Sequence, residues 1–93
     1  MIEKDHFQAL AKVTENEYDE RAENGARILF DVGVWRMVDT VKNDYVSFFI
    51  IDFGLMGETQ YYLLDLETAY QLLTLYHYGS REYLMDKLFE ICQ

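Results

Sequence analysis

Proline is absent from the sequence, and cysteine and glycine are scarce, with 1 and 5 residues among 93. Because 51% of the residues are hydrophobic, the chain has enough apolar side chains to form a core, and a disordered protein is excluded. Its length fits one domain spanning residues 1–93. The lone Cys92 cannot form an intramolecular disulfide, which is typical of a protein from the reducing cytoplasm.

Basic residues are also few: 8 Lys and Arg stand against 17 Asp and Glu, for a net charge of −9. Phosphate backbones and anionic membrane surfaces repel such a chain, so direct nucleic-acid binding and membrane binding are not expected. The longest apolar run, residues 46–51, is interrupted by Ser47 and is far shorter than the roughly 20 residues of a membrane span. Residues 1–5 lack the basic-then-apolar order of a signal peptide. We therefore expect a cytoplasmic protein that binds other proteins.

Catalytic and cofactor motifs are missing as well. His6, His77 and Cys92 are the soft metal ligands of the chain, and their wide separation lacks the paired spacing of a zinc site. Gly54 and Gly57 are not followed by the lysine of a P-loop and do not form a dinucleotide-binding motif. We predict no metal, no cofactor and no enzymatic activity.

Asp52 is the residue on which an alternative, a small-ligand or enzymatic site, would depend, because it interrupts an otherwise apolar strand. Its simplest interpretation is an ion pair with Arg27 or Arg36, or a position at the exposed end of the strand. The other interpretation is a functional carboxylate with a raised pKa, in the pocket of a small ligand-binding or enzymatic domain.

The N-terminal segment, residues 2–24, has a helical pattern. Thr14 and Glu17 have the spacing of a capping box, which would start a second helix at that point. Whether the helix is continuous or broken near Thr14 stays open, and Asn24-Gly25 supplies a stop. The apolar residues recur at spacings of three and four: Phe7, Leu10, Ala11, Tyr18 and Ala22.

The central segment, residues 26–64, is rich in β-branched and aromatic residues. Short polar or glycine-containing links divide it, which predicts an antiparallel meander of three to four strands. Gly33 predicts a tight turn or bulge, and Lys42-Asn43-Asp44 a polar turn. Arg27–Val41 also fits a helix, although the strand interpretation is favoured.

The strand at residues 45–53 is apolar on both faces, so both faces should be covered. Either the N-terminal helix covers one face and the C-terminal helices the other, or a second subunit does so. We predict substantial burial of four consecutive residues: Phe48, Phe49, Ile50 and Ile51.

Two helices are predicted at the C-terminal end. Asp65 has the position of an N-cap, and Gly79-Ser80 ends one helix and begins the next. The last helix, residues 81–92, should bury Leu84, Leu88 and Ile91. The predicted fold is therefore α+β: an N-terminal helix, an antiparallel meander and two C-terminal helices.

An acidic stripe is the first candidate for a binding site. Glu15, Asp19 and Glu23 lie at i, i+4 and i+8, with Glu20 alongside, so one face of a helix would present all four carboxylates. Such a row is either a solvated face that keeps the chain soluble, or a charge array that resembles a nucleic-acid backbone.

Tyrosines are the second candidate, because tyrosine is common at protein interfaces. The apolar content and the tyrosines together predict self-association, most simply as a two-fold homodimer. Six of the 8 tyrosines lie in residues 61–83, and the candidates for partner binding are Tyr61, Tyr70, Tyr78 and Tyr83.

In general character the chain is similar to the small, acidic, phage-encoded inhibitors of bacterial defence nucleases, the anti-CRISPR-like proteins. Some members of that class occupy nucleic-acid channels with carboxylates. The resemblance implies a stoichiometric inhibitor of a basic, nucleic-acid-handling partner and transfers no residue roles. Toxin-neutralising immunity proteins have the same character and are the competing interpretation.

Overall fold

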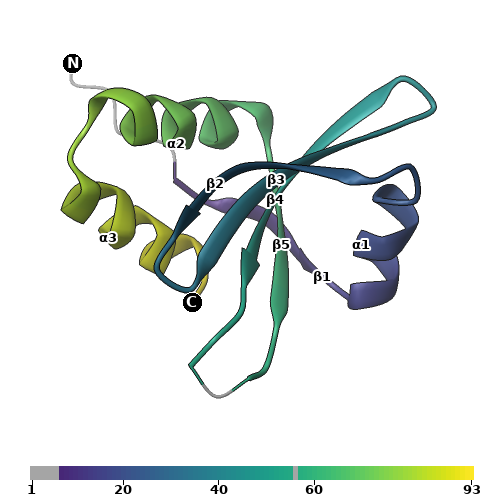
Figure 1. Cartoon of the computed structure of the whole chain (residues 1–93), viewed down its shortest axis with the longest axis horizontal. Coiled ribbons are helices and arrows are strands. Elements are labelled where there is room, and N and C mark those ends of the chain that lie inside the picture. The colour runs from purple at the N-terminus through teal and green to yellow at the C-terminus, as the bar shows by residue number, and fades with distance from the viewer. Residues whose placement is uncertain (1–6, 56) are drawn as a thin grey trace.

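The computed structural model describes residues 7–55 and 57–93, which form a five-stranded antiparallel sheet and three helices (Figure 1). The spatial order of the strands is β1-β5-β4-β3-β2. This arrangement confirms the predicted α+β fold. The elements in chain order are β1 (Ala9–Val13), α1 (Glu15–Arg21), β2 (Ala26–Val32), β3 (Trp35–Lys42), β4 (Tyr45–Asp52), β5 (Gln60–Leu64), α2 (Leu66–Tyr78) and α3 (Arg81–Ile91).

The N-terminal segment differs from the prediction, because Ala9–Val13 is an edge strand rather than part of a helix. It pairs antiparallel with β5, so that Val13 lies opposite Tyr61, and it raises the number of strands from the expected three or four to five. The helix begins only after Thr14, where the predicted break and capping box are confirmed. The Glu17 N–H donates to the Thr14 hydroxyl, and the Thr14 N–H donates to the Glu17 carboxylate, each at 3.1 Å. Residues 2–6 of the predicted helix lie outside the described residues.

The central meander is confirmed, and the helical alternative for Arg27–Val41 is wrong. Arg27 lies opposite Asp39 in the pairing of β2 with β3. Gly33 lies in the turn between these strands with φ of +59°, a conformation that favours glycine. Asn43 and Asp44 both have positive φ and form the two-residue hairpin turn between β3 and β4.

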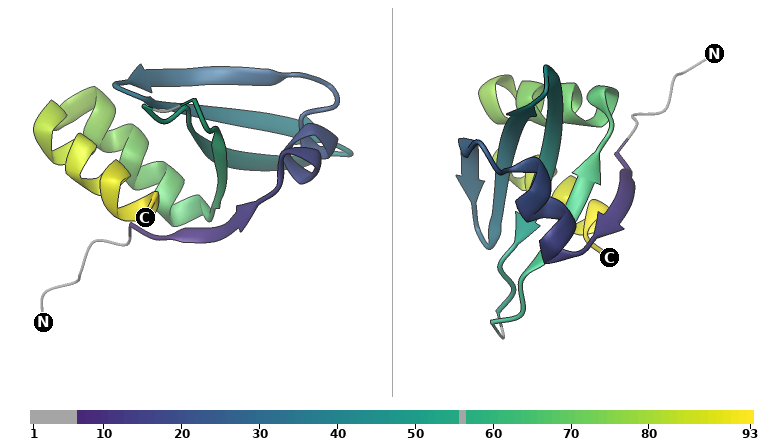
Figure 2. Two further views of the ribbon diagram at one scale, coloured as in Figure 1. Left: turned by 90° about the horizontal axis from the view of Figure 1, so that it is seen from below. Right: turned by 90° about the vertical axis from the view of Figure 1, so that its right-hand side faces the viewer.

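The helices lie on opposite sides of the sheet, with α2 and α3 on one side and α1 on the other (Figures 1 and 2). This is the first of the two predicted ways of covering strand β4, and it requires no second subunit. Ile50 belongs to the α2–α3 side, and Phe49 and Ile51 belong to the α1 side. All three are buried as predicted, whereas Phe48 is half-buried.

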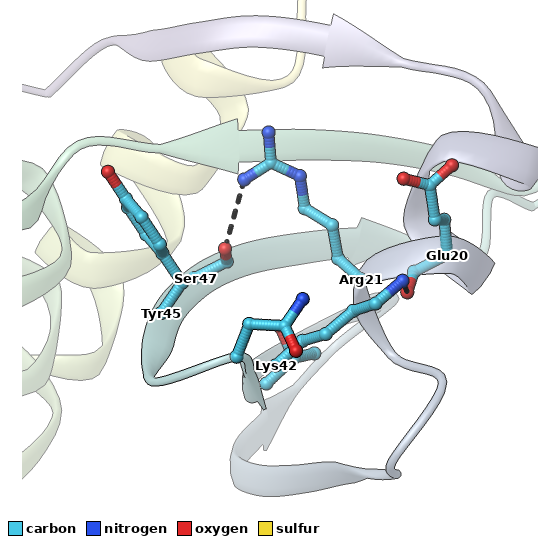
Figure 3. A pocket seen from close by; sticks show the side chains of 7 residues that line it. Glu20, Arg21, Lys42, Tyr45 and Ser47 are labelled. Atoms are coloured by element: carbon cyan, nitrogen blue, oxygen red, sulfur yellow. Dashed lines mark hydrogen bonds between the residues drawn. The ribbon is translucent and has the colours of Figure 1, made fainter.

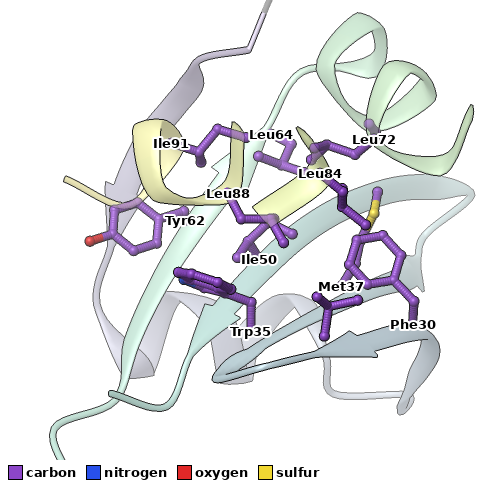
Figure 4. Packing of buried hydrophobic residues seen from close by; sticks show 12 residues of the cluster. Phe30, Trp35, Met37, Ile50, Tyr62, Leu64, Leu72, Leu84, Leu88 and Ile91 are labelled. Atoms are coloured by element: carbon purple, nitrogen blue, oxygen red, sulfur yellow. The ribbon is translucent and has the colours of Figure 1, made fainter. Parts of the chain in front are cut away.

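The main core lies between the sheet and the two C-terminal helices (Figure 4). The N-caps of both helices, Asp65 and Ser80, are confirmed. The predicted stripe of α3 is buried in this core, and Phe89 is exposed. Within the part of the chain that the structure describes, no helix has the length and apolar character needed to span a membrane. The buried residues of the main core are Phe30, Val32, Trp35, Met37, Ile50, Tyr62, Leu64, Ala69, Leu72, Leu84, Leu88 and Ile91.

Candidate functional site

Helix α1 is held on the sheet by an aromatic contact. The Tyr18 ring stacks on the Tyr61 ring with centroids 4.7 Å apart and meets the Phe49 ring edge-on at 5.0 Å. Tyr18 is half-buried, while the acidic residues of the helix are exposed. This contact docks the seven-residue helix on the sheet although the helix contributes no fully buried residue.

All four acids of the predicted stripe are exposed. Glu15, Asp19 and Glu20 lie on this helix, but the helix ends at Arg21 and Glu23 lies on the turn that follows, so the prediction that one helix face presents all four is wrong for Glu23. Glu23 forms an ion pair with the Lys42 ammonium at 3.0 Å, and the same ammonium donates to the Glu20 carbonyl oxygen at 3.0 Å. Lys42 thus ties the end of α1 to strand β3. In the described chain, the carboxylates of Glu15, Asp19 and Glu20 have no ion-pair partner. They present uncompensated negative charge at one side of the sheet.

Glu17 is the fourth acid of α1, beside the three members of the stripe that lie on the helix. Hydrogen bonds from the Thr14 backbone N–H and from the Thr14 hydroxyl lower the pKa of its carboxyl below the ordinary value of 4.5. Glu17 is therefore ionised at neutral pH while it caps the helix.

The four candidate tyrosines fall into two groups. Tyr61 lies beside the acidic helix: burial raises the pKa of its hydroxyl, and the nearby carboxylates of Glu15 and Asp19 raise it further. Tyr70, Tyr78 and Tyr83 are exposed on α2 and α3, on the other side of the sheet. The structure therefore brings Tyr61 together with the acidic stripe and separates the other three from it.

Tyr70 belongs to an apolar surface at the edge of α2. Val41 and Val46 are opposite each other in the β3–β4 pairing, and both are about half exposed. Phe48, two residues from Val46 in β4, lines a groove of about 250 Å³ together with Leu66, Ala69, Tyr70 and Leu73. We call the exposed members of this surface the α2-edge patch: Val41, Val46, Leu66 and Tyr70.

A polar groove of about 430 Å³ lies on the α1 side of the sheet (Figure 3). The Arg21 side chain reaches over strand β4, and its Nη1 donates to the Ser47 hydroxyl at 3.1 Å. Sequence reasoning missed this groove, because residues from α1, β3 and β4 form it. We call it the Arg21 groove, and it is lined by Glu20, Arg21, Thr40, Lys42, Asn43, Tyr45 and Ser47.

Asp52 does not pair with Arg27 or Arg36. It is the half-buried last residue of β4, in agreement with the other predicted possibility, a place at the end of the strand. Its Oδ1 accepts a hydrogen bond from the Gly54 N–H at 2.9 Å. The two arginines bind other acids: Arg27 pairs with Asp39 at 2.6 Å, and Arg36 pairs with Asp31 at 2.7 Å. Asp52 therefore stabilises the turn that follows β4.

The soft metal ligands do not form a site in the described residues. Residues 7–55 and 57–93 contain no group of three or more His, Cys, Asp or Glu side chains placed to hold a metal ion, and His6 lies outside these ranges. Burial raises the pKa of the Cys92 thiol to about 12, and the nearby Asp52 adds to this effect. The thiol is therefore protonated at neutral pH and is a poor nucleophile.

No protein-family model, no curated protein and no solved structure matches the chain.

Proposed function

We propose that the chain is an acidic protein-binding module that acts as a stoichiometric inhibitor of a basic, nucleic-acid-handling partner. In this proposal the carboxylates of α1 take the place of phosphates against Lys and Arg of the partner, as in an anti-CRISPR-like inhibitor. The observation that carries the proposal is the exposed acidic stripe on a helix that the Tyr18–Tyr61 stack holds in place.

The fixed position of the helix supports this function because a rigid charge array loses little conformational freedom on binding. Successive members of the stripe, such as Glu15 and Asp19, are separated by about 6 Å along a helix. Like charges at this spacing repel each other by a few tenths of a kcal/mol, so a cationic partner relieves a repulsion already present in the free protein. Tyr61 lies beside these acids and adds aromatic surface to the same interface.

Charge complementarity also supports a basic partner. The net charge of −9 favours rapid encounter with a positively charged channel and disfavours encounter with other acidic proteins. A toxin-neutralising immunity protein would use the same electrostatics on a toxin, so the nature of the partner separates the two functions.

The test compares two variants that each lose four negative charges. The first replaces the stripe with amides: Glu15→Gln, Asp19→Asn, Glu20→Gln and Glu23→Gln. The matched control replaces three Glu and one Asp that are exposed elsewhere: Glu58→Gln, Glu67→Gln, Glu82→Gln and Asp86→Asn. Both variants should stay folded, because exposed substitutions usually change stability by less than about 0.5 kcal/mol each.

Partners are first captured from a host lysate with the native protein, and their association rates are then measured for both variants. We expect the stripe variant to associate at least about tenfold more slowly at physiological salt and the control variant to stay near the native rate. Single-stranded and duplex DNA should compete with the native protein for the same partner. Equal rates for the two variants would reduce the stripe to a solubility device, and a partner that DNA does not compete for would favour an immunity protein.

A further inference from the structure

The Arg21 groove is a concentration of hydrogen-bond donors on a strongly acidic protein. Two of the 8 basic residues, Arg21 and Lys42, line it together with Thr40 and Ser47. Figure 3 labels Arg21, Lys42 and Ser47. Thr40 lies opposite Ser47 in the pairing of β3 with β4, so the two hydroxyl side chains are neighbours on the same face of the sheet. The acidic stripe alone does not account for this cluster.

The Lys42 ammonium already binds Glu23 and the Glu20 carbonyl oxygen, but the donors of Arg21 are incompletely used. The Arg21 guanidinium has five N–H groups, and in the described chain its hydrogen bond goes to Ser47. Thr40 is only 2% exposed, and its hydroxyl has no hydrogen-bond partner among the described residues. A buried hydroxyl without a partner is rare in folded proteins, so a polar ligand atom that reached the Thr40 hydroxyl would stabilise it.

We propose that the Arg21 groove binds the phosphate group of a small molecule. Arg21 supplies a planar set of charged donors that suits a phosphate, Lys42 adds a second positive charge, and a phosphate oxygen gives the Thr40 hydroxyl the partner that it lacks. The groove volume of about 430 Å³ lies within the roughly 300–1,000 Å³ of small-molecule sites and exceeds what a phosphate ion fills. The remainder of the ligand lies toward Asn43 and Tyr45, whose side chains complete the lining.

The negative charge of the protein opposes this binding without preventing it. At physiological ionic strength the screening length is about 8 Å, so distant carboxylates have little effect on the groove. Three acids are close: Glu20 lines the groove, Glu23 is paired with Lys42, and Asp44 stands between the lining residues Asn43 and Tyr45. Glu20 should therefore weaken phosphate binding, so a variant that lacks the Glu20 carboxylate should bind phosphate more tightly.

The experiment is an NMR titration of the ¹⁵N-labelled chain with inorganic phosphate, adenosine monophosphate and adenosine. Both phosphate-bearing probes should shift the backbone signals of Thr40 and Ser47 and the Arg21 side-chain N–H signal, and adenosine alone should not. If the monophosphate binds more tightly than inorganic phosphate, the site takes a phosphorylated small molecule. If the two bind equally, the site takes the free ion. The absence of shifts at these positions with both phosphate probes would overturn the proposal.

Three variants test the charged residues of the site, and a fourth tests Thr40. Arg21→Gln should weaken phosphate binding by about tenfold or more, whereas Arg81→Gln, the same change on α3, should leave it unchanged. Glu20→Gln should tighten binding by a few fold, because it removes an unpaired carboxylate from the lining of the groove.

Thr40→Val separates the proposed role of the hydroxyl from a structural one. Valine has nearly the shape of threonine, so the free protein should unfold at the same temperature or higher once the buried unpartnered hydroxyl is gone. Phosphate binding should nevertheless fall by several fold. A Thr40→Val variant that binds phosphate as well as the native protein, or an Arg81→Gln variant as weak as Arg21→Gln, would contradict the assignment.

Discussion

The two faces of the sheet are covered in different ways. On one face, the 13 residues of α2 and the 11 of α3 close a core that contains 12 buried residues among those the structure describes. On the other face, the 7 residues of α1 cover a cluster whose buried members in the described chain are Val38, Phe49 and Ile51. The acidic stripe and the Arg21 groove lie on the thinly covered face.

This difference follows from how each helix is stabilised. Helix α3 buries Leu84, Leu88 and Ile91, so packing holds it in place. Helix α1 buries no residue fully and depends on its capping box and on the half-buried Tyr18. A short helix with little packing leaves its side chains and the neighbouring strand surface available to partners and ligands, so we assign both proposed binding sites to this face.

The largest expected effect tests whether α1 excludes solvent from its face of the sheet as completely as α2 and α3 exclude it from the other face. Phe49 and Ile50 are adjacent in β4, point to opposite faces and are both fully buried. Phe49→Ala and Ile50→Ala should each destabilise the protein by about 2–5 kcal/mol in urea unfolding, because each removes a side chain from a close-packed site. Val46→Ala, at an exposed position of the same strand, should cost less than about 1 kcal/mol.

If Phe49→Ala costs less than about 1 kcal/mol while Ile50→Ala costs the full amount, α1 does not close its face in solution. The α1 side of the sheet would then be open to solvent, and only the α2–α3 side would be covered.

The sequence predicts this two-sided arrangement because the relevant signals are local. Strand β4 lacks alternation of polar and apolar residues, which indicates cover on both faces, and Asp65 and Ser80 mark the starts of α2 and α3 by their own side chains. The capping box at Thr14 and the hairpin turn at Asn43 and Asp44 are similarly encoded over a few residues.

Features that depend on distant pairing could not be predicted in the same way. Ala9–Val13 pairs with β5, about fifty residues later in the chain, and its apolar spacing fits a helix equally well. The Arg21 groove joins three elements, and no short motif marks it. One signal was available: a two-residue turn at Asn43 and Asp44 places Thr40 opposite Ser47, two hydroxyl residues within an apolar hairpin.

A smaller effect tests the dependence of α1 on its cap. Thr14→Ala removes the two hydrogen bonds of the Thr14 hydroxyl, one accepted from the Glu17 N–H and one donated to the Glu17 carboxylate. The hydrogen bond from the backbone N–H of residue 14 to that carboxylate remains. The change should destabilise α1 by about 1 kcal/mol at pH 7. Hydrogen exchange of the α1 amides measures this local loss. Ser80→Ala is the matched control: it removes the N-cap of α3, where position N3 is Tyr83 rather than a carboxylate.

The pH dependence distinguishes the two caps. The folded-state pKa of Glu17 lies below its ordinary value of 4.5, so its contribution is fully present above that pH and is lost as the pH falls through the folded-state pKa. The difference between native and Thr14→Ala exchange should therefore shrink in acid, while the Ser80→Ala difference should not follow this titration. Parallel behaviour of the two variants would mean that packing, rather than the capping box, holds α1.

The smallest expected effect on the stability of the monomer comes from changes in the α2-edge patch. Self-association remains a prediction of the sequence, and we expect it at this patch because its four exposed side chains are uncharged, while each copy has a net charge of −9. Light scattering at micromolar concentration should give a mass near twice 11.1 kDa. Val46→Thr should restore the monomer, whereas Ile28→Thr should not, because Ile28 is equally exposed, at 52% against 51%, but lies outside the patch. Neither change should alter monomer stability by more than about 0.5 kcal/mol.

Added salt shortens the screening length from about 8 Å toward 3 Å, so it should strengthen this dimer while it weakens a complex made through the acidic stripe. A monomer at all salt concentrations would rule out the dimer and leave the patch, with Tyr70, as a surface for a different protein.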